Sequence, residues 1–380
     1  LPKRRKMVVQ RHFEICLRLQ GGSCQTVFSD REDKRCFVEK IYFYIHPYFW
    51  PKAPIPDNAN TDWPGFGHGI YAWTIQTQLR LAESGVDCEL TSKLPERGVV
   101  FAHRECLSAI DGLFEGRVTR SASRYIVDIS ADLKPYPYAN FHVVQNVFQE
   151  RLYANASYIP HWPQPALIPR DANRGEAFVN AAYFGNFKNL PDELRSDAWA
   201  RQLDALDMIW LEKYQKFKIQ DPDSYECDVG WNDFRDIDVI IAIRELGGGH
   251  SGFRHKPASK LINAWLAGIP IIVGREYQYR AMRRSELDFI EVSSIDEALS
   301  ALRLLKNNRD LVRRMVDNGR IRSLEYTADA TTKKWRSLIE GTIVPAYQRW
   351  LRLGASQRLA SLVSDVCGSH VRRVVAKFLG

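Results

Sequence analysis

The chain has 380 residues and carries 53 Lys and Arg against 45 Asp and Glu, which gives a net charge of +8. This length exceeds one ordinary hydrophobic core, so two domains are expected. Hydrophobic residues make up 45% and charged residues 26% of the chain, as is typical of a soluble globular protein. The positive charge favours an anionic partner, such as a phosphate, nucleotide, acidic glycan, nucleic acid or anionic membrane, without selecting among them.

Seven cysteines are scattered along the chain without a CxxC pair. This pattern favours reduced thiols in a cytoplasmic protein and argues against a zinc module. No uncharged apolar run approaches the ~20 residues that span a bilayer. The N-terminal residues lack the continuous apolar segment of a secretory signal, so we expect a cytoplasmic location. The basic run Lys3–Lys6 is either a solvated tail or a peripheral contact with the inner face of an anionic membrane.

Residues 1–35 are expected to form an N-terminal extension, followed by a first α/β domain over 36–165. The elements predicted for this domain are a strand at 37–46, a helix at 70–84, strands at 86–91 and 98–102, a helix from Arg104, and strands at 124–129 and 141–144. Strands that alternate with helices predict a parallel sheet. The long, Pro-rich loop 47–69 is expected to be functional, because long ordered loops in compact domains usually are.

Four prolines without periodicity mark the segment Tyr158–Gly175 as a linker between domains. A second α/β domain is expected over 166–345, with C-terminal helices over 346–380. The elements predicted there are strands at 179–184 and 237–243, and helices at 191–206, 294–305, 309–318, 328–350 and 357–377.

The most informative run is HKPASKLINAWLAGIPIIVG, from His255 to Gly274. Pro257 suits the first position of a helix, where its missing N–H costs nothing. Apolar residues then recur at helical spacing, and Gly268 is expected to end the helix. The strand 271–273 follows the turn at Pro270.

Cations crowd the start of this helix: Arg254, His255, Lys256 and Lys260. Because the helix dipole is already positive there, each cation should cost roughly 0.3–1 kcal/mol. A bound polyanion reverses that penalty, since free backbone N–H groups and the dipole both favour phosphate. The alternative is that these side chains simply point into water.

The chain resembles the GT-B glycosyltransferases, and among them the bacterial "group 1" branch that uses nucleotide sugars. The resemblance rests on the run from His255 with the following REYQYR, on the strand DIDVIIAIR and on the YFGN turn at Tyr183–Asn186. It implies an α/β GT-B fold, in which two Rossmann-like parallel-sheet domains face each other across a cleft. The C-terminal helices of relatives cross back onto the first domain.

The activity that the resemblance implies is transfer of a sugar from a nucleotide sugar, UDP- or GDP-linked, to a glycan or other hydroxyl acceptor. No cofactor and no metal are expected, because positive side chains usually replace the metal in GT-B enzymes. Many retaining members carry two Glu residues across this helix start, where this chain has His255 and Asn263. Asn263 can still hydrogen-bond ribose hydroxyls, more weakly, and the stereochemistry of transfer stays open.

The expected donor site combines several groups. Lys256, Ser259 and Lys260 are expected to bind the diphosphate, by charge and hydrogen bonds. Arg244 ends the preceding strand, at the edge of a parallel sheet where ligands gather. It either reaches the same phosphates or pairs with Glu245. By resemblance Glu276 faces the donor sugar, and the alternative is a solvated carboxylate.

Glycines complete the donor prediction. The motif Gly65–Gly69 has GxGxG spacing and no strand directly before it, which argues against an NAD site. By resemblance, Gly67 and Gly69 let the backbone approach the donor phosphates and the acceptor, and Gly185 belongs to the YFGN turn. The glycine-rich loop 247–252 is either a phosphate cover or a connector.

A general base is needed if the reaction inverts the sugar configuration. The candidates are His103, His68 and Asp62, with His46 behind them, and each has a structural role as its alternative. Trp50, Trp63, Phe66 and Trp73 can form a stacking wall for an acceptor sugar, although Trp73 is expected in the core.

Two other functions fit parts of the sequence. A GT-B-fold epimerase would act on a nucleotide sugar without an acceptor. A basic nucleic-acid-binding protein would use the positive charge. Because the basic residues are dispersed and no recognised binding module is present, we expect no nucleic-acid partner.

Overall fold

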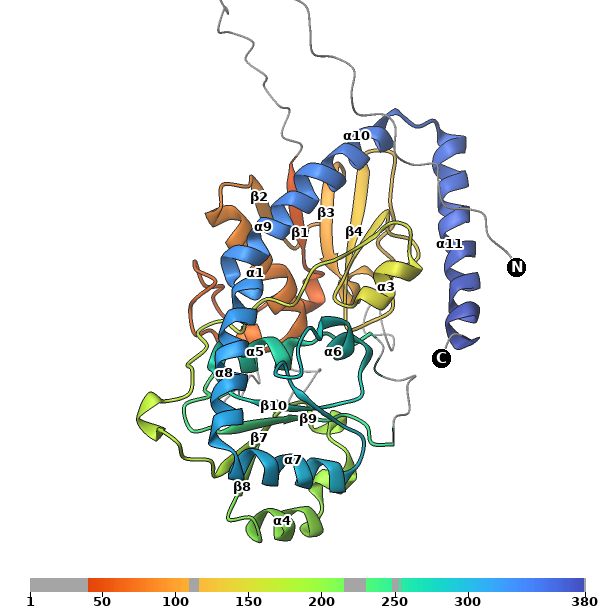
Figure 1. Ribbon diagram of the computed structural model, residues 1–380. Helices are drawn as coiled ribbons and strands as arrows, with labels where there is room; N and C mark the ends of the chain where they lie inside the picture. The colour runs from red at the N-terminus through yellow and green to blue at the C-terminus, as the bar shows by residue number, and fades with distance from the viewer. Residues whose placement is uncertain (1–39, 109–115, 215–229, 248–252, 254, 379–380) are drawn as a thin grey trace, which may run out of the picture. The chain divides into compact units, whose positions relative to one another are not determined.

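Figure 1 shows the computed structural model, which describes residues 40–108, 116–214, 230–247, 253 and 255–378. Two parallel sheets organise these residues, one before and one after residue 170. Apolar strands alternate with helices along both halves, which is the pattern that buries a parallel sheet on both faces.

The first sheet has six strands in the order β2-β1-β3-β4-β5-β6, and all neighbouring pairs are parallel. Its strands are β1 (Ile41–Tyr44), β2 (Cys88–Thr91), β3 (Gly98–His103), β4 (Arg124–Ala131), β5 (Phe141–Val144) and β6 (Ala156–Tyr158). Its helices are α1 (Gly69–Glu83), α2 (Arg104–Leu107) and α3 (Val147–Leu152), with the short 3-10 helices η1 (Pro47–Phe49) and η2 (Pro64–Gly67) in the long loop. The sequence predicts these strands except β6, and it misses α3.

The second sheet has five strands in the order β11-β10-β9-β7-β8, again parallel. Its strands are β7 (Asn180–Gly185), β8 (Ile209–Tyr214), β9 (Val239–Ala242), β10 (Ile271–Gly274) and β11 (Ile290–Val292). Its helices are α4 (Asp197–Asp204), α5 (Ser259–Ala267), α6 (Tyr277–Met282), α7 (Ile295–Asn307) and α8 (Arg309–Ser323). The sequence misses the two outer strands, β8 and β11, because only one residue in them is fully buried.

Helix α5 begins two residues later than expected. Pro257 precedes the helix, and Ala258 is the N-cap, with φ −89° and ψ 34°. Alanine offers no side-chain oxygen to cap the first N–H groups. The prediction at the other end is correct, since Gly268 adopts the left-handed conformation with φ 70° and ends the helix. The helix therefore begins with an uncapped N-terminus, which suits an anion.

The C-terminal helices are α9 (Ala328–Leu338), α10 (Val344–Arg352) and α11 (Ala355–Phe378), with a π-helical turn at Ile339–Ile343. Trp335 from α9 and Tyr347 from α10 lie in the hydrophobic core of the first sheet. Tyr347 donates a hydrogen bond to the Ser123 carbonyl over 2.8 Å, immediately before β4. The end of the chain thus packs against strands from its beginning. Within the described residues, no helix has the length and hydrophobicity to cross a membrane.

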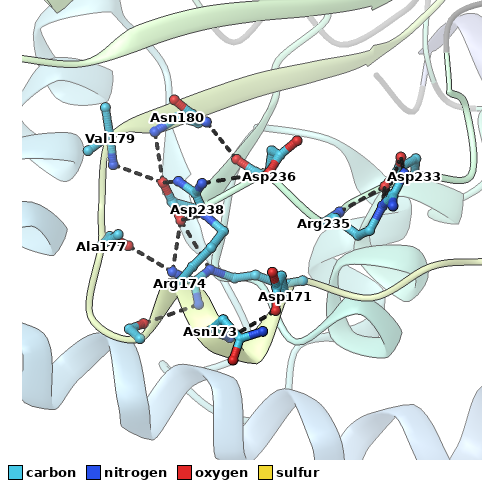
Figure 2. Close-up of polar contacts among 12 residues, drawn as sticks. Asp171, Asn173, Arg174, Ala177, Val179, Asn180, Asp233, Arg235, Asp236 and Asp238 are labelled. Atoms are coloured by element: carbon cyan, nitrogen blue, oxygen red, sulfur yellow. Dashed lines mark hydrogen bonds and ion pairs between the residues drawn. The ribbon is translucent and has the colours of Figure 1, made fainter.

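The segment that leads into the second sheet is held by a buried carboxylate, Asp238, just before β9 (Figure 2). Arg170 and Arg174 form ion pairs with it over 2.8 and 2.7 Å. The backbone N–H groups of Val179 and Asn180 donate to the same carboxylate, each over 2.9 Å. Burial acts to raise the pKa of Asp238, but these hydrogen bonds outweigh it and lower the pKa. This cluster fixes the start of β7 against β9.

Candidate functional site

A cavity of about 90 Å³ lies where residues from both halves of the chain meet. Its lining consists of Phe66, Gly67, Gly69, Ala72, His161, Gln164, Phe184, Trp231, Phe234, Ile240, Ser259, Lys260 and Asn263. Five of these belong to the expected donor site: Gly67, Gly69, Ser259, Lys260 and Asn263. The structure therefore brings the Gly67–Gly69 turn together with the start of α5.

Arg244 and Glu276 form a buried ion pair. Arg244 follows β9 and Glu276 follows β10, so both lie at the carboxyl edge of the second sheet. Each residue is only 7% exposed. Both expected alternatives, a surface pair of Arg244 with Glu245 and a solvated Glu276, are therefore wrong. Arg244 Nε and Glu276 Oε1 are buried without a hydrogen-bond partner among the described atoms. The pair is incompletely satisfied, which is unusual for buried ions.

Lys260 adds a second cation to this cluster. Its ammonium lies 5.4 Å from the centre of the Tyr183 ring, and its side chain lines the cavity. Burial and the nearby Arg244 lower the pKa of Lys260 well below its usual value. Burial also raises the pKa of Glu276, which Arg244 and Lys260 only partly offset. Bringing a phosphate to this place would favour the charged form of Lys260.

Lys256 forms an ion pair with Asp132, which follows β4 in the first sheet. Burial acts to raise the pKa of Asp132, but the charge of Lys256, its hydrogen bond and the charge of His103 together outweigh burial and lower the pKa. The residue before it, Ala131, has φ 49°, a left-handed conformation that costs energy for a residue with a Cβ. The sequence contains no signal for Asp132, since the contact spans more than 120 positions.

Asn263 holds the linker instead of presenting its oxygen to the cavity. Its Oδ1 accepts a hydrogen bond from the backbone N–H of Gln164 over 3.1 Å. Gln164 in turn accepts a bond of 2.7 Å from the indole N–H of Trp231. A ribose hydroxyl at Asn263 would therefore meet mainly its amide N–H groups.

Three histidines that the sequence offers as bases have the same local role. His46, His68 and His103 each cap a helix, with Nδ1 accepting the backbone N–H two residues further on. Burial and the charge of His103 lower the pKa of His68 to about 4. His103 is only 2% exposed, and burial lowers its pKa as well. A Cβ built on Gly69 would lie 3.8 Å from His103 Nε2, which places this histidine beside the glycine turn.

The remaining candidates lie apart from the cavity lining. Asp62 is exposed and accepts a hydrogen bond from Asn232 over 3.0 Å. Gly185 ends β7, and His255 precedes α5 in a half-buried position. Of the four aromatic residues proposed as a stacking wall, Trp50, Trp63, Phe66 and Trp73, only Phe66 lines the cavity. Trp73 lies in the core, as expected. Arg254 and positions 248–252 lie outside the described residues.

His161 lines the cavity and was missed by sequence reasoning, because it lies inside the Pro-rich linker. Its Nδ1 lies 2.6 Å from the carbonyl oxygen of Trp162. Its ring meets Trp73 edge-on, with 4.6 Å between the ring centres. The only signal in the sequence is that it is a histidine in a proline-rich linker between two α/β domains. Across the described part of the chain, no group of three or more His, Cys, Asp or Glu could hold a metal ion.

Comparison with known proteins finds no matching family model and no matching curated protein. Solved structures do match. Sucrose-phosphate synthase from Thermosynechococcus elongatus aligns over 81% of this chain and 100% of its own, with a TM-score of 0.52 and 10% identity. AviGT4, a glycosyltransferase involved in avilamycin A biosynthesis, aligns over 82% of this chain and 98% of its own, with a TM-score of 0.46 and 13% identity.

A third match is Anabaena HepE in complex with UDP-glucose, over 80% of this chain and 100% of its own, with a TM-score of 0.44 and 12% identity. The likeness to sucrose-phosphate synthase, together with the two parallel sheets, confirms the α/β GT-B fold that the sequence predicts.

Proposed function

We propose that this protein is a glycosyltransferase that moves a sugar from a nucleotide-sugar donor to a hydroxyl acceptor, such as a glycan, without a metal ion or other cofactor. The observation that carries this proposal is the charge cluster at the carboxyl edge of the second sheet. The GT-B fold shared with sucrose-phosphate synthase supports it.

The charge cluster has an excess of cations. Three of them, Arg244, Lys256 and Lys260, lie with two carboxylates, Glu276 and Asp132. The pKa of Lys260 is lowered because burial and neighbouring cations disfavour its charge, so the cluster is electrostatically incomplete. The uncapped start of α5 points to the same place. A diphosphate supplies the missing negative charge and accepts hydrogen bonds from helix N–H groups.

The same groups can stabilise the departing nucleoside diphosphate. As the bond between the sugar and the phosphate breaks, negative charge develops on the phosphate oxygen. Fixed positive charge next to that oxygen lowers the barrier, as an oxyanion hole does. The place of Lys260 and Ser259 in the cavity lining supports this role for them.

The cavity is smaller than the roughly 300–1,000 Å³ of a typical ligand site. At about 90 Å³ it holds only a part of a nucleotide sugar. The proposal therefore requires its walls to separate when the donor binds, or most of the donor to lie outside it. Closure of the walls on the donor would then exclude water that hydrolyses it.

A ligand screen tests the proposal directly. Thermal unfolding is followed with UDP, GDP, ADP and CDP and with their sugars. A ligand at 100 times its dissociation constant stabilises the protein by about 2.7 kcal/mol, which a thermal shift detects. We expect at least one nucleotide to do so, and UDP or GDP is the expected base. No shift with any of them contradicts the proposal.

Product analysis separates the alternatives. A glycosyltransferase releases a nucleoside diphosphate when donor and acceptor are present. An epimerase converts the donor alone into a second nucleotide sugar. A nucleic-acid-binding protein gives a salt-dependent gel shift and turns over neither.

The basic run Lys3–Lys6, which the sequence suggested for membrane contact, lies outside the described residues. We also propose peripheral contact with an anionic membrane surface through α11. Leu359, Val363 and Val371 on this helix are 61%, 53% and 62% exposed, and they recur every four or eight residues. An exposed apolar stripe on a basic protein is typical of a helix that lies in a membrane interface. Replacing Leu359 and Val363 by Glu should abolish flotation with phosphatidylglycerol vesicles. Equal flotation of wild type and variant contradicts this contact.

A further inference from the structure

We propose that His161 is the general base that accepts the proton of the acceptor hydroxyl, and that the transfer therefore inverts the configuration of the sugar. This inference rests on the proposed function. Nothing in the sequence motifs points to His161. Three features of the structure carry it: the tautomer of its ring, its place in the cavity and the contrast with the other histidines at the site.

The tautomer follows from hydrogen-bond chemistry. Nδ1 of His161 lies 2.6 Å from the backbone carbonyl of Trp162. A carbonyl oxygen can only accept a hydrogen bond, so Nδ1 must carry the proton. In the neutral ring Nε2 then has a free lone pair and can accept a proton. A second group that orients a histidine in this way is the usual arrangement of a general base.

The candidate histidines near the glycine turn have the opposite tautomer. Nδ1 of His68 accepts the N–H of Ile70 over 3.2 Å, and Nδ1 of His103 accepts the N–H of Glu105 over 3.3 Å. A backbone N–H can only donate, so Nδ1 in these rings has no proton. In the neutral form their Nε2 is therefore a donor. Such rings can hydrogen-bond a phosphate or sugar oxygen, but Nε2 cannot remove a proton from a hydroxyl.

The position of His161 matches the requirement of the reaction. It lines the same cavity as Lys260 and Ser259, the groups proposed to bind the donor diphosphate. Gly67 and Gly69 line this cavity as well, and at glycines the backbone can approach a substrate closely. The edge-on contact with Trp73 limits rotation of the ring. The proton acceptor and the leaving-group site thus lie on the walls of one small space.

The chemical step balances with these groups alone. The acceptor oxygen attacks the anomeric carbon of the sugar while His161 Nε2 takes the hydroxyl proton. The bond from that carbon to the phosphate oxygen breaks, and its electron pair leaves with the nucleoside diphosphate. Lys260 stabilises the new negative charge. One displacement of this kind inverts the anomeric configuration.

The protonation state at neutral pH is the one that a base requires. Burial lowers the pKa of His161, while its bond to Trp162 and the charge of Asp132 act in the opposite direction. The other titratable group that lines the cavity is Lys260, whose own pKa is lowered. His161 is therefore neutral above its ordinary range near 6.5. Protonation of His161 should therefore reduce activity only when the pH drops below that range.

Two substitutions of His161 separate catalysis from structure. His161→Asn keeps an N–H near the position of Nδ1, and so can keep the bond to Trp162, but it has no Nε2. His161→Gln places an amide near Nε2, and an amide oxygen is not basic. The assay uses UDP-glucose, or whichever sugar nucleotide the wild type turns over, with methyl glycosides as acceptors. Thermal unfolding and nucleoside diphosphate binding report folding and the donor site.

We expect both variants to fold, to bind the nucleoside diphosphate within about twofold of wild type, and to lose about 10²–10⁴ in kcat. The acidic limb of the wild-type pH profile should vanish in the variants, and added imidazole should restore part of the activity of His161→Asn. The product of the wild type should have the anomeric configuration opposite to that of the donor.

Other results overturn the assignment. Retained configuration in the product overturns it alone and leaves the glycosyltransferase function standing. The same holds if His161→Asn keeps kcat within about threefold of wild type, because the ring would then serve only to anchor the linker. If the variants fail to bind nucleotide, the role of His161 is structural. A wild-type protein that transfers no sugar from any donor overturns both the proposed function and this assignment.

Discussion

Strand β9 has a charged cluster at each end, and the two clusters differ in how completely their charges are paired. At its start, Asp238 is fully buried and receives hydrogen bonds from Arg170, Arg174 and two backbone N–H groups (Figure 2). Just beyond its end, Arg244 and Glu276 are also buried, yet each keeps a buried polar atom that has no hydrogen-bond partner among the described residues. The difference supports the proposal that the start of β9 contributes to stability and that the region beyond its end binds a ligand.

The directions of the pKa shifts agree with this division. At the start of β9 the pKa of Asp238 is lowered, so its pairing more than offsets burial. At the end, burial raises the pKa of Glu276 and lowers that of Lys260, so pairing there does not offset burial. Groups whose charged forms are disfavoured in the empty protein are typical of functional sites. An anionic ligand would reverse the shift of Lys260, because a nearby negative charge favours its protonated form.

The largest expected effect is on catalysis at the end of β9. Lys260→Met keeps the length of the side chain and removes its charge. We expect kcat/KM to fall by about 10²–10³, the range found when one electrostatic stabiliser is lost. Stability in urea should not fall, because a buried ammonium is removed. The matched control is Lys333→Met on α9, an exposed lysine that pairs with Asp329. Near-normal transfer by Lys260→Met would remove Lys260 from the mechanism.

The second effect is on stability at the start of β9. Asp238→Asn leaves Arg170 and Arg174 without their carboxylate. Breaking such a pair costs about 2–3 kcal/mol of unfolding free energy, less than for fully buried partners, because the side chains of Arg170 and Arg174 are 17% and 20% exposed. Urea unfolding measures this loss. Transfer per folded molecule should stay unchanged, and a loss of activity without a loss of stability would reverse the assignment of the two ends.

The pH dependence of that stability has a defined sign. Because the pKa of Asp238 is lower in the folded protein, its contribution is present above its unfolded value of about 3.9. The contribution is lost as the pH falls through the folded value. The stability difference between wild type and Asp238→Asn should therefore shrink below about pH 4, as urea titrations at several pH values would show.

A smaller effect is expected at Asp132, which forms an ion pair with Lys256. Asp132→Asn frees this lysine, so affinity for a nucleoside diphosphate should rise about three- to fivefold, near the upper range for partly exposed ion pairs. Calorimetry measures the affinity. In a Lys256→Ala background the same substitution should have no effect, and Asp310→Asn on α8 controls for the change in net charge. If the affinity still rises in the Lys256→Ala background, the gain reflects only the change in overall charge and not the release of Lys256.

The smallest effect is proton uptake on donor binding. The pKa of Lys260 is lowered, and a phosphate beside it should raise the pKa again. Binding should therefore take up a fraction of one proton at any pH where Lys260 is partly deprotonated, and it should weaken as the pH rises. Calorimetry in two buffers with different ionisation enthalpies measures this fraction. The fraction should disappear in Lys260→Met, and uptake that remains there would come from another group.

Much of the fold was predictable from local sequence. The central strands were predicted from the apolar runs at 98–103, 239–242 and 271–274, which are buried on both faces of their sheets. The end of α5 was predicted from Gly268, which adopts the left-handed conformation there. The outer strands β8 and β11 and the short strand β6 were missed, because a partly exposed strand lacks a continuous apolar signal.

The candidate site was predictable only where its residues are close in sequence. Ser259, Lys260 and Asn263 lie on one helix, and all three line the cavity. A pairing of Arg244 with Glu245, one of the two alternatives that the sequence left open, was wrong, because the partner of Arg244 is Glu276, 32 positions away. The order of the parallel strands in the sheet brings their carboxyl ends together. That order cannot be read from the sequence.

By itself the sequence determined the alternation of buried strands and helices, the cationic start of α5 and the glycines around it, because each depends on neighbours a few residues away. Only the tertiary structure decided what those charges meet. It paired Lys256 with Asp132 and Arg244 with Glu276, and it placed His161 beside the cavity. Charge pairing and burial depend on residues that are far apart in the chain. These long-range contacts decide which buried polar groups lack a hydrogen-bond partner within the protein.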